Sequence, residues 1–235
     1  MDFYVMTLFP EMVLDGINHS IIKRAMNDNL VKVHGINIRD YSGNKHGKVD
    51  DYPYGGGTGL VMTPQPIYNT FLAIKDQLAE DTPVIYLSPK GKPFTQQKAK
   101  ELSQKQSVVL LCGHYEGVDQ RVIDEIVTEE LSIGDYVLTG GELGAMVVID
   151  ATARLVTGVL TEEATTNESF NNDLLEHPHY TRPFEFMGHK VPEVLVGGHH
   201  GKIDQFRQAQ SVALTQERRP DLLKTVKEEG DKNNE

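Results

Sequence analysis

Three glycine-containing segments carry the residue types that a small-molecule site needs. They are residues 87–91, 113–117 and 133–141, and the second and third contain the carboxylates of Glu116 and Asp135. Glycine lets backbone N–H and C=O groups approach a flat heterocycle, and a carboxylate can pair with a cation. Each segment alone is typical of an ordinary turn. Because each sits at the carboxyl end of a predicted strand, we expect them to form one ligand cleft at the carboxyl edge of a parallel sheet.

The elements that position these segments are predicted from hydrophobic periodicity. Short β-branched or aromatic runs predict strands at residues 3–9, 32–38, 83–87, 108–112 and, shorter, 136–138. Helical spacing between and after them predicts helices at residues 11–27, 66–78, 95–104, 119–129 and 142–156. This alternation is typical of an α/β fold in which helices flank a parallel sheet. We expect the α/β domain to end near residue 160.

Other candidate sites favour structural interpretations. The glycine run at residues 52–59 lacks both the Gly-Lys-Ser/Thr of a phosphate loop and the third glycine of a dinucleotide fingerprint, so we interpret it as a sharply turning loop or a close backbone approach. The histidine pairs at residues 177–179 and 199–200 have no partner at metal-ligand spacing. Cys112 lies in an apolar run and is expected to pack as a small hydrophobe. Arg154, in an apolar helix, either reaches solvent or awaits an anion.

The composition changes after residue 160. Residues 161–176 hold five acidic residues and no Lys or Arg, which predicts an exposed, mobile linker. Residues 177–219 hold six Lys or Arg against four Asp or Glu, with helical spacing at Ile203, Phe206 and Ala209. We therefore expect a small, mostly helical domain over residues 177–235.

Charge limits the functions open to the chain. Its 235 residues include 23 Lys or Arg and 34 Asp or Glu, a net charge of -11, and one cysteine. The chain is therefore not a polyanion binder held by overall charge, and any nucleic-acid site must be a local patch. The single cysteine and the absence of a signal-like or long apolar stretch predict a cytoplasmic protein.

Four motifs, in this order, resemble those of the bacterial tRNA (guanine(37)-N1) methyltransferases of the SPOUT superfamily. They are Pro-Tyr-Gly-Gly-Gly at 53–57 with Gly-Leu-Val-Met at 59–62, Leu-Leu-Cys-Gly-His-Tyr-Glu-Gly-Val-Asp-Gln-Arg at 110–121, Ser-Ile-Gly-Asp-Tyr-Val-Leu-Thr-Gly-Gly-Glu at 132–142, and Pro-His-Tyr-Thr-Arg-Pro at 178–183. The likeness covers nearly the whole chain.

The resemblance implies a fold and a set of ligands. It implies a knotted methyltransferase domain over residues 1–160, with a C-terminal trefoil knot in its parallel sheet, a linker, and a helical tRNA-binding domain. It further implies a homodimer with its active site at the subunit interface, and S-adenosylmethionine as methyl donor, with magnesium as a possible further requirement and no protein metal ligands assigned. The implied cofactor-binding residues are Tyr86, Leu87, Ser88, Pro89, Gly113, Tyr115, Glu116, Gly117, Ser132, Ile133, Gly134, Asp135, Tyr136, Val137, Leu138, Gly140 and Gly141.

Two catalytic residues follow from the same resemblance. Arg154 matches the arginine placed against the target guanine, and Glu168 matches a linker aspartate that serves as general base, with one methylene more. Gly144 also departs from the family, which commonly has proline there. Removing the proton from guanine N1 moves negative charge onto O6, so a carboxylate base and an arginine at O6 are complementary.

An acidic chain must hold tRNA by local cations, and we expect these on the C-terminal domain at Lys190, Lys202, Arg207, Arg218 and Arg219. Two alternatives stay open. One is a SPOUT methyltransferase acting on another RNA base or on ribose. The other is an RNA-binding or cofactor-sensing protein without turnover.

Overall fold

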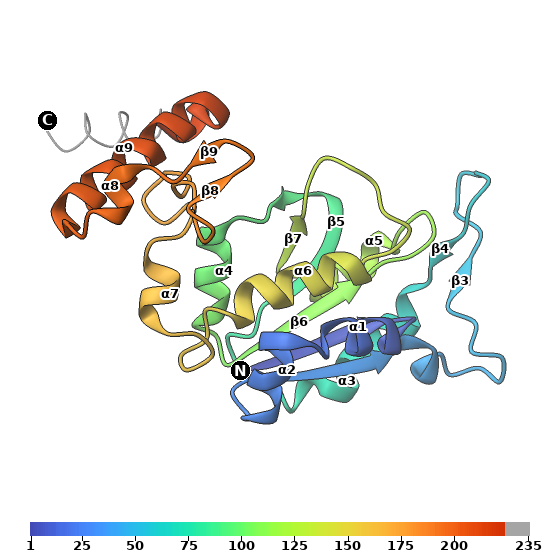
Figure 1. Ribbon diagram of the computed structural model, residues 1–235. Coiled ribbons are helices and arrows are strands. Elements are labelled where there is room, and N and C mark those ends of the chain that lie inside the picture. Colours follow the sequence, from blue (N-terminus) through green and yellow to red (C-terminus); the bar gives the residue numbers. More distant parts are fainter. Residues whose placement is uncertain (224–235) are drawn as a thin grey trace, which may run out of the picture. The chain divides into compact units, whose positions relative to one another are not determined.

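The computed structural model describes residues 1–223 and divides the chain into two units. The first unit is Met1–Leu160, and the second begins at Thr161 (Figure 1). Residues 224–235 of the predicted C-terminal domain lie outside the described part. Within residues 1–223, no helix combines the length and apolar character needed to cross a membrane.

A five-stranded sheet forms the first unit. Its strands lie in the order β2-β1-β6-β5-β7, and every neighbouring pair is parallel. Their bounds are Asp2–Thr7 for β1, Lys32–Asn37 for β2, Val84–Pro93 for β5, Ser107–Cys112 for β6 and Glu129–Ser132 for β7. The predicted α/β class with a parallel sheet is confirmed.

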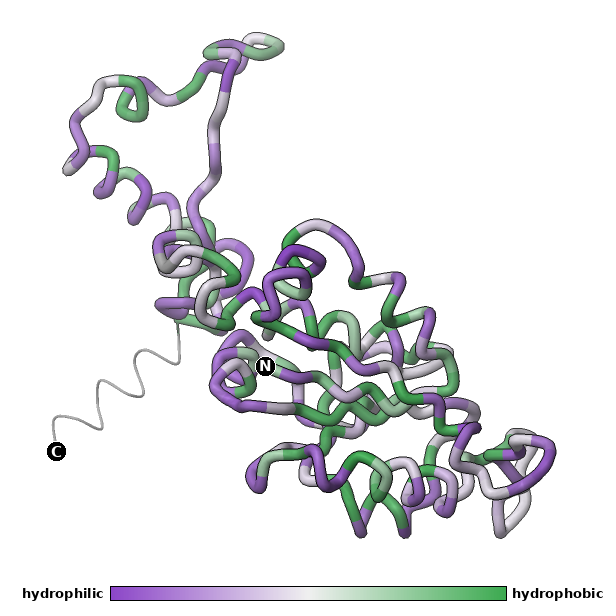
Figure 2. Tube along the Cα trace, turned by 90° about the horizontal axis from the view of Figure 1, so that it is seen from below, coloured by the Kyte–Doolittle hydropathy of each residue, from purple (hydrophilic) through white to green (hydrophobic). Residues whose placement is uncertain are grey.

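Helices cover both faces of this sheet because its strands are apolar on both sides. In β1, Phe3 and Val5 belong to one buried cluster, and the alternate residues Tyr4 and Met6 belong to another. The first cluster receives side chains from α1 (Pro10–Ile17), α2 (Ser20–Asn27) and α6 (Glu142–Ala153), and α4 (Gln96–Ser103) adds Leu102. The second receives side chains from α3 (Pro64–Lys75) and α5 (Gln120–Ile126). Figure 2 shows stretches of hydrophobic residues in green along the segments of this unit.

The predicted helix at residues 11–27 is wrong in one respect, because the segment forms two helices. The first, α1, ends at Ile17, and Ser20 begins α2 with a positive φ of 49°. Gly16 and the polar residues after Ile17 explain the break, since glycine is a poor helix former and Asn and Ser favour turns.

The predicted strand at residues 136–138 is also wrong, since these residues lie in an exposed loop. The fifth strand is instead β7, which begins at Glu129. The predicted helix at 119–129 therefore extends three residues too far, because α5 ends at Ile126. Further, β5 continues past Leu87 to Pro93, with a register shift between Leu87 and Lys92. The first candidate loop is therefore an irregularity within a long strand.

Smaller elements complete the first unit. A short 3-10 helix, Ile38–Tyr41, precedes an antiparallel pair formed by β3 (Asp50–Asp51) and β4 (Val61–Met62). The glycine run at residues 52–59 connects these two strands. Gly55, Gly56 and Gly57 all have positive φ, which confirms the interpretation as a sharply turning loop.

The second unit contains α7 (Glu162–Thr166), the antiparallel pair β8 (Glu185–Phe186) and β9 (His189–Lys190), α8 (Glu193–Val196) and α9 (His200–Arg218). The predicted linker is tied to α9, because Leu175 N donates to Thr215 Oγ1 at 2.8 Å. Thr215 in turn donates to Ser211 O at 2.7 Å, so the buried hydroxyl is satisfied on both sides.

Candidate active site

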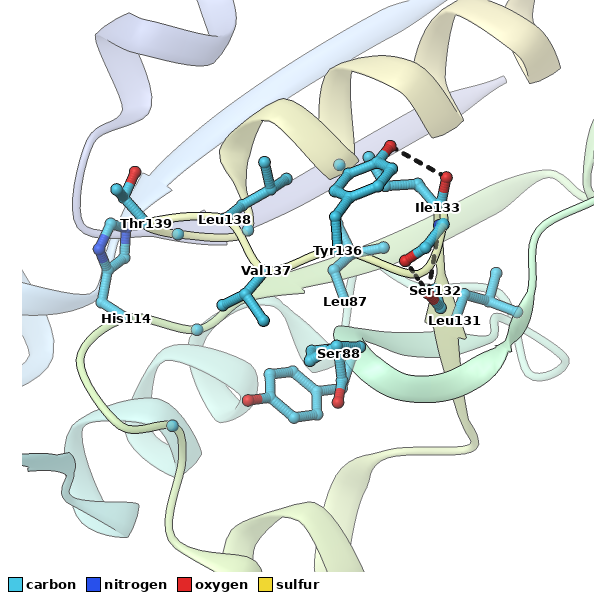
Figure 3. A pocket seen from close by; sticks show the side chains of 18 of the residues that line it. Leu87, Ser88, His114, Leu131, Ser132, Ile133, Tyr136, Val137, Leu138 and Thr139 are labelled. Atoms are coloured by element: carbon cyan, nitrogen blue, oxygen red, sulfur yellow. Dashed lines mark hydrogen bonds between the residues drawn. The ribbon is translucent and has the colours of Figure 1, made fainter.

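A pocket of about 160 Å³ lies where the three candidate segments meet (Figure 3). It brings together these predicted cofactor residues: Tyr86, Leu87, Ser88, Pro89, Gly113, Tyr115, Glu116, Gly117, Ser132, Ile133, Gly134, Tyr136, Val137, Leu138, Gly140 and Gly141. Asp135 is different, because it is exposed and does not line the pocket. Sequence reasoning missed His114, Leu131, Thr139 and Gly144, which do line it.

The segments converge because their strands are neighbours. In the sheet, β5 lies between β6 and β7, so the carboxyl ends of all three parallel strands meet at one edge. Internal hydrogen bonds shape the longest segment. Ser132 Oγ donates to Gly134 O at 3.0 Å, and the Tyr136 hydroxyl donates to Ile133 O at 3.1 Å, as Figure 3 shows.

Glu116 supplies the carboxylate of the pocket, and its side chain leaves no room for a side chain at Gly59. A Cβ on Gly59 would lie 2.2 Å from Glu116 Cγ, so only glycine fits beside this side chain. The backbone joins the same segments, because Glu116 N donates to Leu60 O at 2.9 Å. The glycine run therefore packs against the pocket.

Two buried titratable groups near the pocket are held neutral. Burial raises the pKa of the Tyr86 phenol, and the negative charge of Glu130 raises it further. Burial also raises the pKa of the Cys112 thiol well above its usual range, with the Glu142 carboxylate adding to the effect. A fully buried, protonated thiol is a poor nucleophile, which agrees with the packing role expected for Cys112.

The two expected catalytic residues belong to different units. Arg154 is the C-cap residue of α6 in the first unit. The helix predicted at residues 142–156 ends at Ala153, so Arg154 lies one residue past its observed end. Glu168 lies in the second unit, where it lines a cavity of about 390 Å³. The other residues of this cavity are Asn167, Asn172, Leu174, Leu175, Glu176, His177, Asp204, Arg207, Gln208 and Ser211.

The expected tRNA-binding cations are all exposed. Lys190 lies on β9, 3.8 Å from Glu185, and Lys202, Arg207 and Arg218 lie on α9. Arg219 is paired with Asp221 at 2.7 Å. Arg207 alone also lines the cavity that contains Glu168.

Together these features define a class of protein. A pocket of glycine backbone, apolar side chains and one carboxylate, at the carboxyl edge of a parallel sheet, is the arrangement of an α/β enzyme that binds a small organic ligand.

Comparison with known proteins narrows the class. The sequence profile described as tRNA (Guanine-1)-methyltransferase TrmD matches residues 1–225. The chain belongs to this family and is a methyltransferase.

Curated relatives match along almost the whole chain. The tRNA (guanine-N(1)-)-methyltransferase of Clostridioides difficile (strain 630) is 56% identical over 230 residues, covering 97% of this chain and 100% of that protein. The protein of the same name from Alkaliphilus oremlandii (strain OhILAs) is 58% identical over 226 residues, covering 94% of this chain and 91% of that protein. That of Caldanaerobacter subterraneus subsp. tengcongensis is 54% identical over 225 residues, covering 95% and 92%.

Proposed function

We propose that this enzyme transfers a methyl group from S-adenosylmethionine to N1 of guanine 37, beside the anticodon of tRNA, in the cytoplasm. The observation that carries the proposal is the pocket at the edge of the sheet, in a chain whose relatives are named for methylation of guanine N1 in tRNA. Residues 1–160 are the methyltransferase domain, residues 161–176 carry the base, and residues 177–235 bind tRNA.

The pocket residues fit this methyl donor. Glycine backbone at residues 113, 140 and 141 can meet the polar edge of the adenine, and the apolar side chains of Leu87 and Ile133 can cover its faces. The Glu116 carboxylate suits a ligand that carries a sulfonium and an ammonium group. When bound, the donor supplies an activated methyl group.

The protein must then activate the acceptor. Guanine N1 carries a proton and becomes nucleophilic once that proton leaves. Glu168 is the base that accepts it, and the Arg154 guanidinium holds the negative charge that moves to O6. Within residues 1–223, no group of three or more His, Cys, Asp or Glu is placed to hold a metal ion.

The enzyme works as a homodimer with its active site at the subunit interface. An apolar surface supports this proposal: Met12 on α1 and Leu143 and Val147 on α6 are exposed, and these two helices pack together. Exposed apolar side chains on adjacent helices are typical of a surface that a second copy covers. Within each subunit, the C-terminal part of the methyltransferase domain carries the trefoil knot that the resemblance implies.

The tRNA contacts are Lys190, Lys202, Arg207 and Arg218. These cations are exposed, and the last three lie on one helix of the least acidic part of the chain. Local positive charge is what phosphate binding requires of a chain with a net charge of -11.

Methyl transfer from labelled S-adenosylmethionine to tRNA transcripts with G37 or A37, followed by mapping of the modified base, tests the proposal. We expect N1-methylguanine at position 37 and no product from the A37 transcript. Methyl on another base or on ribose would favour a different RNA methyltransferase. Binding of the donor without turnover would favour a sensor.

Variants test the two catalytic assignments. Glu168→Gln and Arg154→Ala should each lower turnover about 100-fold or more and leave donor binding nearly intact. Asp173→Asn is the matched control, because Asp173 is an exposed carboxylate of the same segment that does not line the cavity. Equal losses of donor binding and turnover would assign the two residues a structural role.

A further inference from the structure

Glu142 is a buried carboxylate that the proposed chemistry does not use. It is the first residue of α6, and only 2% of it is exposed. A buried carboxylate is costly unless hydrogen-bond donors satisfy it. Its donors therefore show what this residue holds in place.

Two donors reach Glu142 from distant parts of the chain. Thr7, at the end of β1, donates its hydroxyl to Glu142 Oε1. His114, which follows β6, places Nε2 2.7 Å from Oε1 and 2.8 Å from Oε2. Because an ionised carboxylate only accepts hydrogen bonds, we assign the hydrogen of the His114 ring to Nε2. Glu142 thus connects the ends of two neighbouring strands to the start of α6.

His114 carries this connection into the pocket. It lines the pocket itself, as Figure 3 shows, whereas Glu142 and Thr7 do not. Its backbone forms a bridge with Gly140, on the opposite segment of the pocket wall. A Cβ on Gly140 would lie 2.5 Å from His114 Nε2 and 2.6 Å from Glu142 Oε2. The two pocket segments therefore pack directly on the His114–Glu142 pair.

We propose that Glu142 is a positioning residue that acts through His114 to hold residues 113–117 against residues 139–141 before the methyl donor binds. The proposal rests on the donor assigned under the proposed function. A pocket assembled in advance binds its ligand more tightly, because the ligand does not then bear the entropic cost of ordering two loops. Loss of the pair should weaken donor binding without touching the reacting atoms.

Calorimetric titration with S-adenosylhomocysteine tests the proposal in four proteins: wild type, Glu142→Ala, His114→Ala and the double variant. Each single change should raise Kd about tenfold, as expected when a charge-assisted hydrogen bond that orders the site is lost. The double variant should bind no more weakly than either single one, because Glu142 acts only through His114. Losses that multiply to about a hundredfold would overturn the proposal.

Conservative variants separate positioning from simple packing. Glu142→Gln keeps an acceptor and His114→Gln keeps a donor, so each should bind S-adenosylhomocysteine within about threefold of wild type. The pair His114→Ala and His114→Gln tests the proposal even if Glu142→Ala does not fold. Binding equal to wild type in His114→Ala would overturn it.

A measurement on the ligand-free protein separates this proposal from the assigned donor. Proton NMR should find a slowly exchanging, downfield His114 Nε2–H resonance in the wild type, as expected for a ring hydrogen bonded to the Glu142 carboxylate, and this signature should be lost in Glu142→Ala. The control Glu11→Gln removes an exposed carboxylate from α1 and should change neither the spectrum nor Kd. Wild-type protein that keeps the signature but does not bind S-adenosylhomocysteine would refute the assigned donor. Wild-type protein that binds it without the signature would refute the positioning role.

Discussion

The positions of Lys202, Arg207 and Arg218 on α9 allow their proposed contacts with tRNA to be tested. An α-helix turns about 100° and rises about 1.5 Å per residue. Arg218 follows Arg207 by eleven residues, so the two side chains lie within about 20° of one face and about 16 Å apart along the axis. Lys202 precedes Arg207 by five residues and lies about 140° round the helix. Arg207 and Arg218 can therefore contact one RNA strand together, whereas Lys202 meets RNA from another side.

Counterion release fixes the size of the effect. Each phosphate contact contributes about 0.7 to 0.9 to the slope of log affinity against log salt. Removing Arg207 and Arg218 together should therefore lower the slope by about 1.4 to 1.8, and Lys202→Ala should lower it by about 0.7 to 0.9. A change in total charge alone acts weakly at a distance, because salt screens exposed charges beyond about 10 Å.

The assay is tRNA binding by fluorescence anisotropy across about 50 to 200 mM salt, the range in which phosphate contacts dominate the change. Lys75→Ala is the control, since it removes one exposed cation from α3 in the first unit. Affinity for S-adenosylhomocysteine should not change in any of these variants. An unchanged slope in the Arg207→Ala/Arg218→Ala protein would refute the reasoning and move the RNA surface away from α9. A change in Lys75→Ala equal to that in the double variant would trace the effect to net charge.

Two further predictions concern stability and assembly. Asp119→Ala removes the N-cap of α5, where Asp119 accepts from Arg121 N at 3.0 Å, and should lower the free energy of unfolding by about 1 kcal/mol at neutral pH. The side-chain hydrogen bond from Arg121 lowers the pKa of Asp119 in the folded state, so this contribution is complete above the unfolded pKa near 3.9 and is lost as pH falls through the folded value. Urea unfolding of both proteins from pH 7 downward checks this, and a difference that grows toward acid pH would contradict it. Val147→Glu places a charge on the apolar surface of α6, where Val147 is 45% exposed, and should shift the protein toward monomer in analytical ultracentrifugation. The control is Leu72→Glu on α3, at a side chain 46% exposed, and dissociation by both variants alike, or a monomeric wild type, would contradict the assigned interface.

The central strands were predictable because their residues are apolar on both faces. Val108 to Cys112 are all fully buried in β6, so a short unbroken apolar run predicts the strand at once. The edge strand β7 was not predictable in this way, because it begins with Glu129 and Glu130. Lys98 on α4 pairs with Glu129 at 2.7 Å, which lets an acidic residue occupy a strand next to the core. Because this ion pair is formed with a residue of another element, the sequence of β7 itself contains no pattern that predicts the strand.

The pocket was predictable to the extent that it depends on loops at strand ends. Glycine-rich segments after buried strands indicated the pocket wall, and the family motifs selected the residues within them. The pattern does not tell which loop side chains turn inward, and Asp135 is the one predicted cofactor residue that does not line the pocket, since it is exposed. His114 was missed although it lies between two predicted pocket residues, Gly113 and Tyr115. Its position in the middle of a predicted ligand loop was the signal that could have found it.

The positioning role proposed for Glu142 could not be predicted from the neighbouring sequence, for a different reason. A glutamate at the first position of a helix is expected to face solvent and interact with the helix dipole, so its type and place suggest nothing unusual. It is buried instead because Thr7, 135 residues away in sequence, supplies a hydrogen bond. That contact exists only because the sheet places β1 beside β6, an order that depends on all the strands at once. Side chains that line a loop can be found from the loop, but a side chain that holds two loops together can be found only after the topology is known.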